Sequence, residues 1–156
     1  MSHRPLILLL EDEPLILMDL EMAAEDRGCA CLATTCVEQA FAALGGDGLP
    51  DVAVLDVTLQ AGNTCVPIAT ELRRLGVPYL LHSGDLDRQD ERIRQLQAEL
   101  VPKPASSARV IEKALELLDP DGLPEKPALP DSCQLACGVK SIHAGTQSGE
   151  IASIRK

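Results

Sequence analysis

The feature that most constrains the fold is a fivefold alternation of short apolar runs with longer segments of helical character, all before residue 119. Residues 5–10 and 51–56 are almost continuously apolar, which is typical of strands buried on both faces. Shorter strands are predicted at 29–33, 77–81 and 100–101. Strands that alternate with helices indicate a parallel sheet, joined by right-handed crossovers and covered on both faces. We therefore predict an α/β fold of the (βα)5 doubly wound type.

The intervening segments predict five helices. Pro14 suits the first turn of one helix, and Gly28 and Gly76 are natural helix ends. The fourth helix should be thinly anchored, because only Ile93 and Leu96 lie on its inward side. Ser106 or Ser107 can cap the last helix. The first four predicted helical ranges are about 14–24, 37–44, 66–75 and 87–97, and the last helix contains the apolar residues Val110, Ile111, Ala114, Leu115 and Leu118.

The pattern ends near residue 118, so we predict one domain over residues 4–118. Beyond it prolines recur at positions 120, 124, 127 and 130, and no helical or strand period survives. We predict a mostly disordered, proline-rich tail over 119–156. This tail is too short for a DNA-binding or catalytic output domain, which favours a stand-alone domain that acts through protein contacts. The alternative is a C-terminally truncated fragment of a larger protein.

The charge of the chain argues against two classes of partner. The formal net charge is −10, with 24 acidic against 14 basic residues. Such a surface repels phosphate backbones and anionic lipids, so we expect no direct binding to nucleic acid or membranes. The longest apolar run, residues 6–10, is too short to span a bilayer. We expect a cytoplasmic protein.

The six cysteines do not predict a disulfide framework. Cys29, Cys31, Cys36 and Cys65 lack CxxC spacing and have apolar neighbours, so we interpret them as small buried hydrophobic residues kept reduced. The tail contains Cys133 and Cys137, with His143 as the remaining plausible ligand. Three scattered ligands are weak support for a zinc site.

Polar residues recur where the predicted strands end. The first strand is followed by Glu11-Asp12, the third ends in Asp56, the fourth is followed by Ser83-Gly84, and the fifth by Lys103-Pro104. Taken singly, each is more often a cap or a turn residue. In an open parallel sheet, however, ligands bind at the carboxyl ends of the strands. The joint occurrence therefore indicates a functional site.

The chemistry of this set favours phosphoryl transfer. Three carboxylates close together repel one another, and a magnesium ion with oxygen ligands offsets that cost. Lys103 would add a second positive charge. A phosphoryl group arriving on Asp56 would then meet the metal, the lysine and the Ser83 hydroxyl, while Gly84 leaves room for its donor.

With these motifs the chain resembles the receiver domain of two-component response regulators (the CheY-like superfamily) over residues 4–118. The resemblance implies the flavodoxin-like strand order 2-1-3-4-5 and a phosphoacceptor at Asp56, served by a histidine kinase or a histidine phosphotransfer protein. It also implies Mg²⁺ bound by Glu11, Asp12, Asp56 and the backbone carbonyl of Thr58, and a cis peptide before Pro104. The side chains of Thr58 and Asp85 would tune the hydrolysis of the phosphoaspartate. A receiver of this kind phosphorylates and dephosphorylates itself and is not a turnover enzyme.

Two features depart from the usual receiver pattern. Leu100 occupies the position where the family usually has an aromatic switch residue, and the fourth helix is short and highly charged. Residues 79–85 resemble a variant found in stand-alone receivers of alphaproteobacteria. We hypothesise that residues 83–97 reorganise in place of an aromatic side chain. A homodimer through the fourth and fifth helices is a further partner that the resemblance allows.

Three other functions were weighed. A haloacid-dehalogenase-like phosphatase needs a second acid two positions after its nucleophile, where this chain has Thr58. A nucleotide-binding flavodoxin-like protein is disfavoured because there is no GxGxxG or Walker-type loop. A pseudo-receiver, which is an adaptor module independent of phosphorylation, remains the main alternative. His82 could be imagined as a phosphohistidine, but strand alternation favours a solvent-side neighbour of Ser83.

Overall fold

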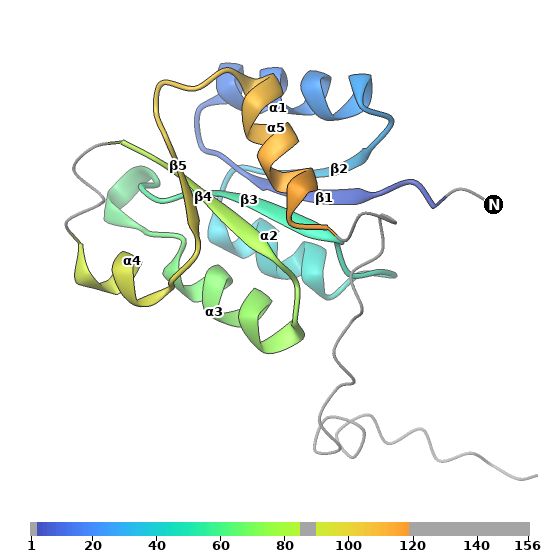
Figure 1. Ribbon diagram of the computed structural model, residues 1–156. Coiled ribbons are helices and arrows are strands. Elements are labelled where there is room, and N and C mark those ends of the chain that lie inside the picture. The colour runs from blue at the N-terminus through green and yellow to red at the C-terminus, as the bar shows by residue number, and fades with distance from the viewer. Residues whose placement is uncertain (1–2, 85–89, 119–156) are drawn as a thin grey trace, which may run out of the picture.

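The computed structural model describes residues 3–84 and 90–118, which form one five-stranded parallel sheet flanked by helices (Figure 1). The strand order is β2-β1-β3-β4-β5, which is the flavodoxin-like order. This confirms the predicted fold class. The strands are β1 (Leu6–Leu10), β2 (Ala30–Thr34), β3 (Val52–Asp56), β4 (Tyr79–Ser83) and β5 (Glu99–Pro102).

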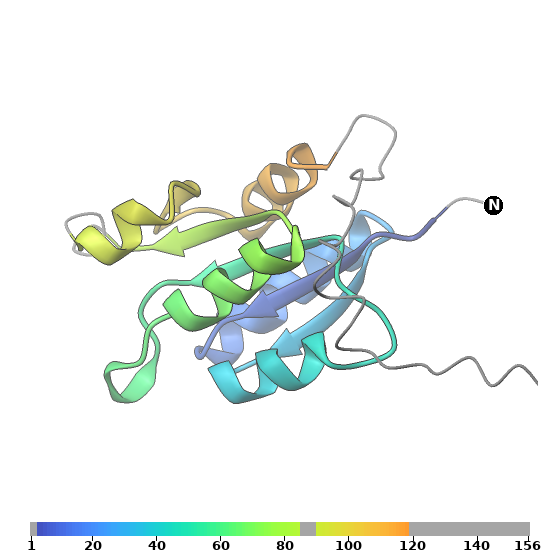
Figure 2. The same cartoon turned by 90° about the horizontal axis from the view of Figure 1, so that it is seen from below.

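Helices cover both faces of this sheet, as Figures 1 and 2 show. One face carries α1 and α5, and the other carries α2, α3 and α4. The described residues also include a short 3-10 turn, η1 (Gln60–Gly62). The helices are α1 (Pro14–Asp26), α2 (Val37–Leu44), α3 (Val66–Leu75), α4 (Glu91–Gln95) and α5 (Ser107–Glu116).

Two hydrophobic cores result from the alternation of side chains along the strands. In β1, Ile7 and Leu9 pack into the core beneath α1 and α5, whereas Leu8 and Leu10 pack into the core beneath α2 and α3. All four side chains are at most 1% exposed. Burial on both faces explains why this strand is read as a continuous apolar run in the sequence.

Two helices have the predicted bounds, whereas each strand differs from its predicted bounds by one or two residues, most of all the fourth. The structure places α2 and α3 at 37–44 and 66–75, as predicted, and Gly76 ends α3 with a left-handed φ of 71°. The fourth strand begins two residues later than predicted. The Val77 N–H bonds to the Leu72 carbonyl and so belongs to the end of α3, and Pro78 has no N–H to give to a sheet.

The fourth helix is shorter than predicted within the described part of the chain. It covers Glu91–Gln95, the Asp90 side chain caps it by accepting from the Arg92 N–H, and Ile93 is its buried residue. Leu96 is only partly buried. The thin anchorage that the sequence predicts is therefore observed for the described part of this helix. The first three residues of the predicted helix, 87–89, lie outside the described residues.

The connection from β3 to α3 is closed at its neck. Thr58 and Thr64 form an isolated antiparallel bridge. The Leu59 N–H donates to the Asn63 carbonyl at 3.0 Å, and the Cys65 N–H donates to the Val57 carbonyl at 3.3 Å. The excursion between these contacts, residues 59–63, includes the left-handed residue Ala61 (φ 59°). Both ends of this loop are therefore tied to each other immediately after Asp56.

The cysteines within the described ranges are all free thiols. Cys29 and Cys65 are buried, as predicted, whereas Cys31 and Cys36 are only partly buried. None of the described helices is long and apolar enough to cross a membrane. The predicted tail, with Cys133, Cys137 and His143, lies outside the described residues.

Candidate functional site

The carboxyl edge of the sheet brings the three predicted acidic residues together. Glu11 and Asp12 directly follow β1, and Asp56 is the last residue of the neighbouring strand β3. One ligand atom from each of the three lies within 4.8 Å of the others. Glu11 and Asp56 are buried, at 1% and 4% exposure, and Asp12 is partly exposed. The structure thus contains a nearly enclosed acidic cluster that opens to solvent at Asp12.

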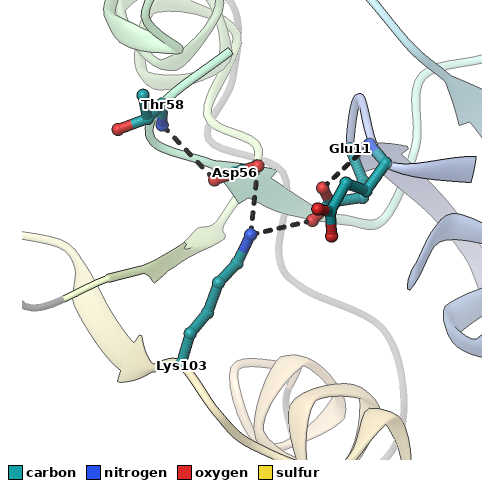
Figure 3. A network of polar contacts seen from close by, with 5 residues as sticks. Glu11, Asp56, Thr58 and Lys103 are labelled. Atoms are coloured by element: carbon teal, nitrogen blue, oxygen red, sulfur yellow. Dashed lines mark hydrogen bonds and ion pairs between the residues drawn. The ribbon is translucent and has the colours of Figure 1, made fainter. Parts of the chain in front are cut away.

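Lys103 reaches into this cluster from the end of β5 (Figure 3). Its Nζ lies 3.1 Å from Asp56 Oδ2 and 3.3 Å from Glu11 Oε2, so one ammonium bridges two buried carboxylates. The Lys103 N–H also donates to the Ser83 carbonyl at 2.7 Å, which ties this residue to the end of β4. The peptide between Lys103 and Pro104 is cis, as predicted.

The pKa values of this pair show how strongly the two side chains interact. Burial raises the pKa of Asp56 to about 7; the negative charge of Glu11 adds to this shift, and Lys103 opposes it. Burial alone would lower the pKa of Lys103, but Asp56 and Glu11 together raise it above its ordinary value. The site therefore contains more negative charge than one lysine offsets, and it favours a further cation.

Backbone amides hold the two buried carboxylates in place. The Thr58 N–H donates to Asp56 Oδ1 at 3.3 Å, and the Glu13 N–H donates to Glu11 Oε1 at 3.2 Å. Asp56 is thus held on one oxygen by the loop that follows it and on the other by Lys103 (Figure 3). The side chain of Thr58 is exposed at this edge. That its carbonyl binds a metal remains a prediction.

Ser83 stands at the end of β4 with an unsatisfied hydroxyl. Its side chain is fully buried, and its Oγ has no hydrogen-bond partner among the described residues. A buried hydroxyl without a partner costs free energy. The Ser83 hydroxyl is therefore available to donate a hydrogen bond to an acceptor at this edge. Gly84 follows it, and Asp85 lies outside the described residues.

His82 corrects one expectation. Its side chain points to the other face of the sheet from that of Ser83, as alternation requires, but it is buried (4% exposed) rather than solvent-side. The reason is that β4 is an inner strand, in register with Asp56 on one side and Val101 on the other, and α1 and α5 cover that face. Both ring nitrogens lack hydrogen-bond partners in the described chain. Burial lowers the pKa of His82 to about 4, and Lys103 adds to this effect.

A cavity beside Asp12 was not anticipated from the sequence. It has a volume of about 440 Å³ and is formed by the loops that follow β1, β2 and β3. Thr35, Cys36, Gln60 and Asn63 line it together with Asp12. The sequence feature that could have identified these residues is their position in the loops after β2 and β3, at the same edge as the acidic cluster. These residues therefore border the site from the side of α2.

The residues present fit a magnesium ion. Mg²⁺ takes hard oxygen ligands and is held in proteins by one or two carboxylates together with water. Glu11, Asp12 and Asp56 supply such oxygens within one short radius. Burial first and the charge of Glu11 second raise the pKa of Asp56, and a cation bound at this carboxylate would oppose both effects. Nitrogen or sulfur ligands, which softer metals prefer, are not part of this cluster.

Comparison with solved structures shows many close matches to the fold. The chain is 35% identical to SdrG from Sphingomonas melonis Fr1, over 74% of this chain and 97% of that one, with a TM-score of 0.61. A response regulator receiver protein from Sinorhizobium medicae WSM419 matches at 22% identity, 76% and 98% coverage, and a TM-score of 0.63. The chemotaxis response regulator CheY4 of Vibrio cholerae matches at 15% identity, 74% and 100% coverage, and a TM-score of 0.64.

Searches with the sequence found no matching family model and no matching curated protein. The structural matches, together with the strand order and the acidic edge, nevertheless define the class of the molecule. The chain belongs to the response-regulator receiver domains of the CheY-like superfamily.

Proposed function

We propose that this protein is a single-domain response regulator of a two-component phosphorelay. In this proposal Asp56 accepts a phosphoryl group, with Mg²⁺, from a histidine kinase or a histidine phosphotransfer protein in the cytoplasm. The phosphorylated domain then signals through protein–protein contacts and turns over no external substrate. The observation that carries the proposal is the position of Lys103 Nζ, 3.1 Å from Asp56 Oδ2 and 3.3 Å from Glu11 Oε2, beside Asp12.

The proposed reaction is a displacement at phosphorus. An Asp56 carboxylate oxygen forms a bond to the phosphorus of a phosphohistidine, and the P–N bond breaks. The donor imidazole leaves with the electron pair of that bond. An acyl phosphate is formed, and the carboxylate charge is replaced by the larger charge of the phosphoryl oxygens. The protein therefore needs groups that hold this charge in place more than it needs an acid or a base.

Three residues of the chain are proposed to serve that role. The Lys103 ammonium can pair first with the Asp56 carboxylate and then with a phosphoryl oxygen, because its Nζ already contacts Asp56. The unpartnered Ser83 hydroxyl can donate to a second oxygen once its side chain is uncovered. Gly84 offers no side chain that would obstruct a donor. Thr58 and Asp85 are proposed to tune the rate at which water removes the phosphoryl group.

Glu11, Asp12, Asp56 and the Thr58 carbonyl would hold the magnesium ion. When bound, the ion supplies positive charge that stabilises the phosphoryl oxygens in transfer. Glu11 accepts the Glu13 N–H through Oε1 and the Lys103 ammonium through Oε2. This carboxylate is therefore oriented by the chain before a ligand arrives. Asp12 is the more exposed of the pair and gives the ion its path from solvent.

The first test is intact-protein mass spectrometry after incubation with acetyl phosphate or phosphoramidate, with Mg²⁺ or with EDTA. We expect the gain of one phosphoryl group that depends on Mg²⁺, is absent in Asp56→Asn, and is slowed in Lys103→Ala. The matched control is Asp51→Asn. Asp51 is buried next to the same strand but at its opposite end, where it accepts the Leu6 N–H. This variant should still be phosphorylated if it is folded, as circular dichroism would show.

The outcomes separate the proposed switch from its main alternative. Phosphorylation that persists in Asp56→Asn would place the acceptor elsewhere. No phosphorylation under any condition, with a folded protein, would contradict the switch and support an adaptor module that works without phosphate.

A further inference from the structure

An open groove lies at the opposite end of the sheet from Asp56, where β4 and β5 begin. Its volume is about 560 Å³. Apolar groups contribute much of its lining, including Val77, Pro78, Leu96 and Leu117, and Tyr79 adds an aromatic ring. The groove is formed by the ends of α3, α4 and α5, which are segments far apart in the sequence. It offers apolar surface that the described chain leaves open.

Two polar groups in this groove lack partners. The Arg73 side chain makes no ion pair or hydrogen bond within residues 3–84 and 90–118, whereas its neighbour Arg74 pairs with Glu71 at 2.7 Å. The Tyr79 hydroxyl likewise makes no hydrogen bond to the described residues. Glu99, a carboxylate of the groove, lies 3.7 Å from Lys113. Within the described ranges, the groove therefore presents beside its apolar surface a guanidinium that makes no ion pair and, within reach of its charge, a phenol that makes no hydrogen bond.

The chain itself contains a segment whose chemistry matches. Residues 119–131 include four acidic side chains and one basic one, Lys126. Pro124, Pro127 and Pro130 are spaced by three, which is the repeat of a polyproline II helix, so in that conformation they share one side. Grooves with aromatic side chains are the usual receptors for such proline repeats. The acidic residues complement Arg73.

The connection is short enough for the segment to reach the groove. Leu117, which directly follows α5, already lines the groove, and Pro124 follows Leu118 by six residues. A chain of that length spans at most about 20 Å. A short tether of this kind gives an effective concentration on the order of 1 mM. Docking that would be weak between separate molecules is therefore sufficient within one chain.

We propose that residues 119–131 bind in this groove of the same molecule, with the prolines against Tyr79 and Leu96 and the acidic side chains near Arg73. Leu96 and Gln97 directly follow α4, so the docked segment joins the tail to the most thinly anchored helix of the domain. The proposal does not depend on phosphorylation at Asp56.

The composition of the chain supplies a direct probe. Tyr79 is the only tyrosine, and there is no tryptophan, so tyrosine fluorescence reports on this groove alone. We would measure acrylamide quenching in the full chain and in the full-length variant Pro124→Ser/Pro127→Ser/Pro130→Ser. If the segment covers the ring, the quenching constant should rise about twofold in the variant, because the tethered segment no longer fills the groove.

A second variant and its neighbour serve as a matched pair. Arg73→Gln should raise the quenching constant, whereas Arg74→Gln, on the same helix but paired outside the groove, should not. Equal quenching in the wild type and the triple-serine variant would overturn the proposal. A difference that appears only as protein concentration rises would place the segment in the groove of a second copy, and it would also overturn the assignment to one molecule. Circular dichroism would show that each variant is folded.

Discussion

His82 is a buried polar side chain that the fold does not satisfy. Its two ring nitrogens have no partner among the described residues, although the strand around it is fully paired. A buried polar group without a hydrogen bond costs about 1–3 kcal/mol. The low pKa of the ring keeps it neutral at physiological pH, which limits this cost but does not remove it.

We therefore expect His82→Leu to stabilise the domain by about 1–2 kcal/mol, because an apolar side chain of similar size removes two unsatisfied nitrogens and keeps the packing. Urea unfolding followed by far-UV circular dichroism measures the change. His82→Ala is the control: it removes the same nitrogens but leaves a cavity, so it should not be stabilising. A less stable His82→Leu protein would show that the imidazole makes favourable contacts that the geometry does not reveal.

At the scale of the elements, α5 closes one face of the sheet and begins at a single cap. The Ser106 side chain accepts a hydrogen bond from the Arg109 N–H at 3.3 Å. The buried residues of α5 are Val110, Ile111 and Ala114. Ser107, the first residue of the helix, is not the residue that caps it.

Ser106→Ala should consequently lower the free energy of unfolding by about 1 kcal/mol, which is the usual effect of losing an N-cap. Ser107→Ala makes the same chemical change one residue later and should have a much smaller effect. The midpoints of urea unfolding compare the two variants. Equal losses would mean that the hydroxyl of Ser106 does not act as the cap in solution.

The elements also show what the sequence could and could not predict. The bounds of α2 and α3 followed from apolar spacing and from the glycines after them, because both signals are local. The start of β4 did not, because it depends on the hydrogen bond that the Val77 N–H makes to the Leu72 carbonyl of the preceding helix.

The same distinction holds for the site. Five polar residues could be assigned to one edge once a parallel sheet was assumed, since the strand ends share an edge. These residues are Glu11, Asp12, Asp56, Ser83 and Lys103. The burial of His82 could not be predicted by alternation alone. Alternation gives the face of a side chain, and only the packing of α1 and α5 decides whether that face is covered.

At the scale of the whole molecule, negative charge is the dominant property. The formal net charge is −10, and the acidic cluster concentrates part of it in a buried place. Self-repulsion of this kind lowers the stability of a compact state and is weakened by salt. The Debye length falls from about 30 Å to about 10 Å between 0.01 M and 0.1 M salt, so distant surface charges are screened but buried neighbours are not.

We expect sodium chloride to raise the unfolding temperature of both the wild type and Asp56→Asn. At equal ionic strength, Mg²⁺ should raise it further in the wild type, by the equivalent of about 1–2 kcal/mol, because the ion binds the folded acidic cluster. Asp56→Asn, which lacks one carboxylate, should lose most of this additional gain. Differential scanning calorimetry with EDTA as the reference measures both effects. An identical response to the two salts in the wild type would contradict a specific magnesium site.

The closed neck between β3 and α3 has a consequence for engineering. The bridge between Thr58 and Thr64 and the bond from the Cys65 N–H to the Val57 carbonyl fasten both ends of the loop 59–63. A foreign peptide inserted at the tip of this loop would extend from a base that these contacts hold closed. A graft displayed in this way would lie at the same edge of the sheet as the acidic cluster, so a peptide that binds it could be brought next to Asp12.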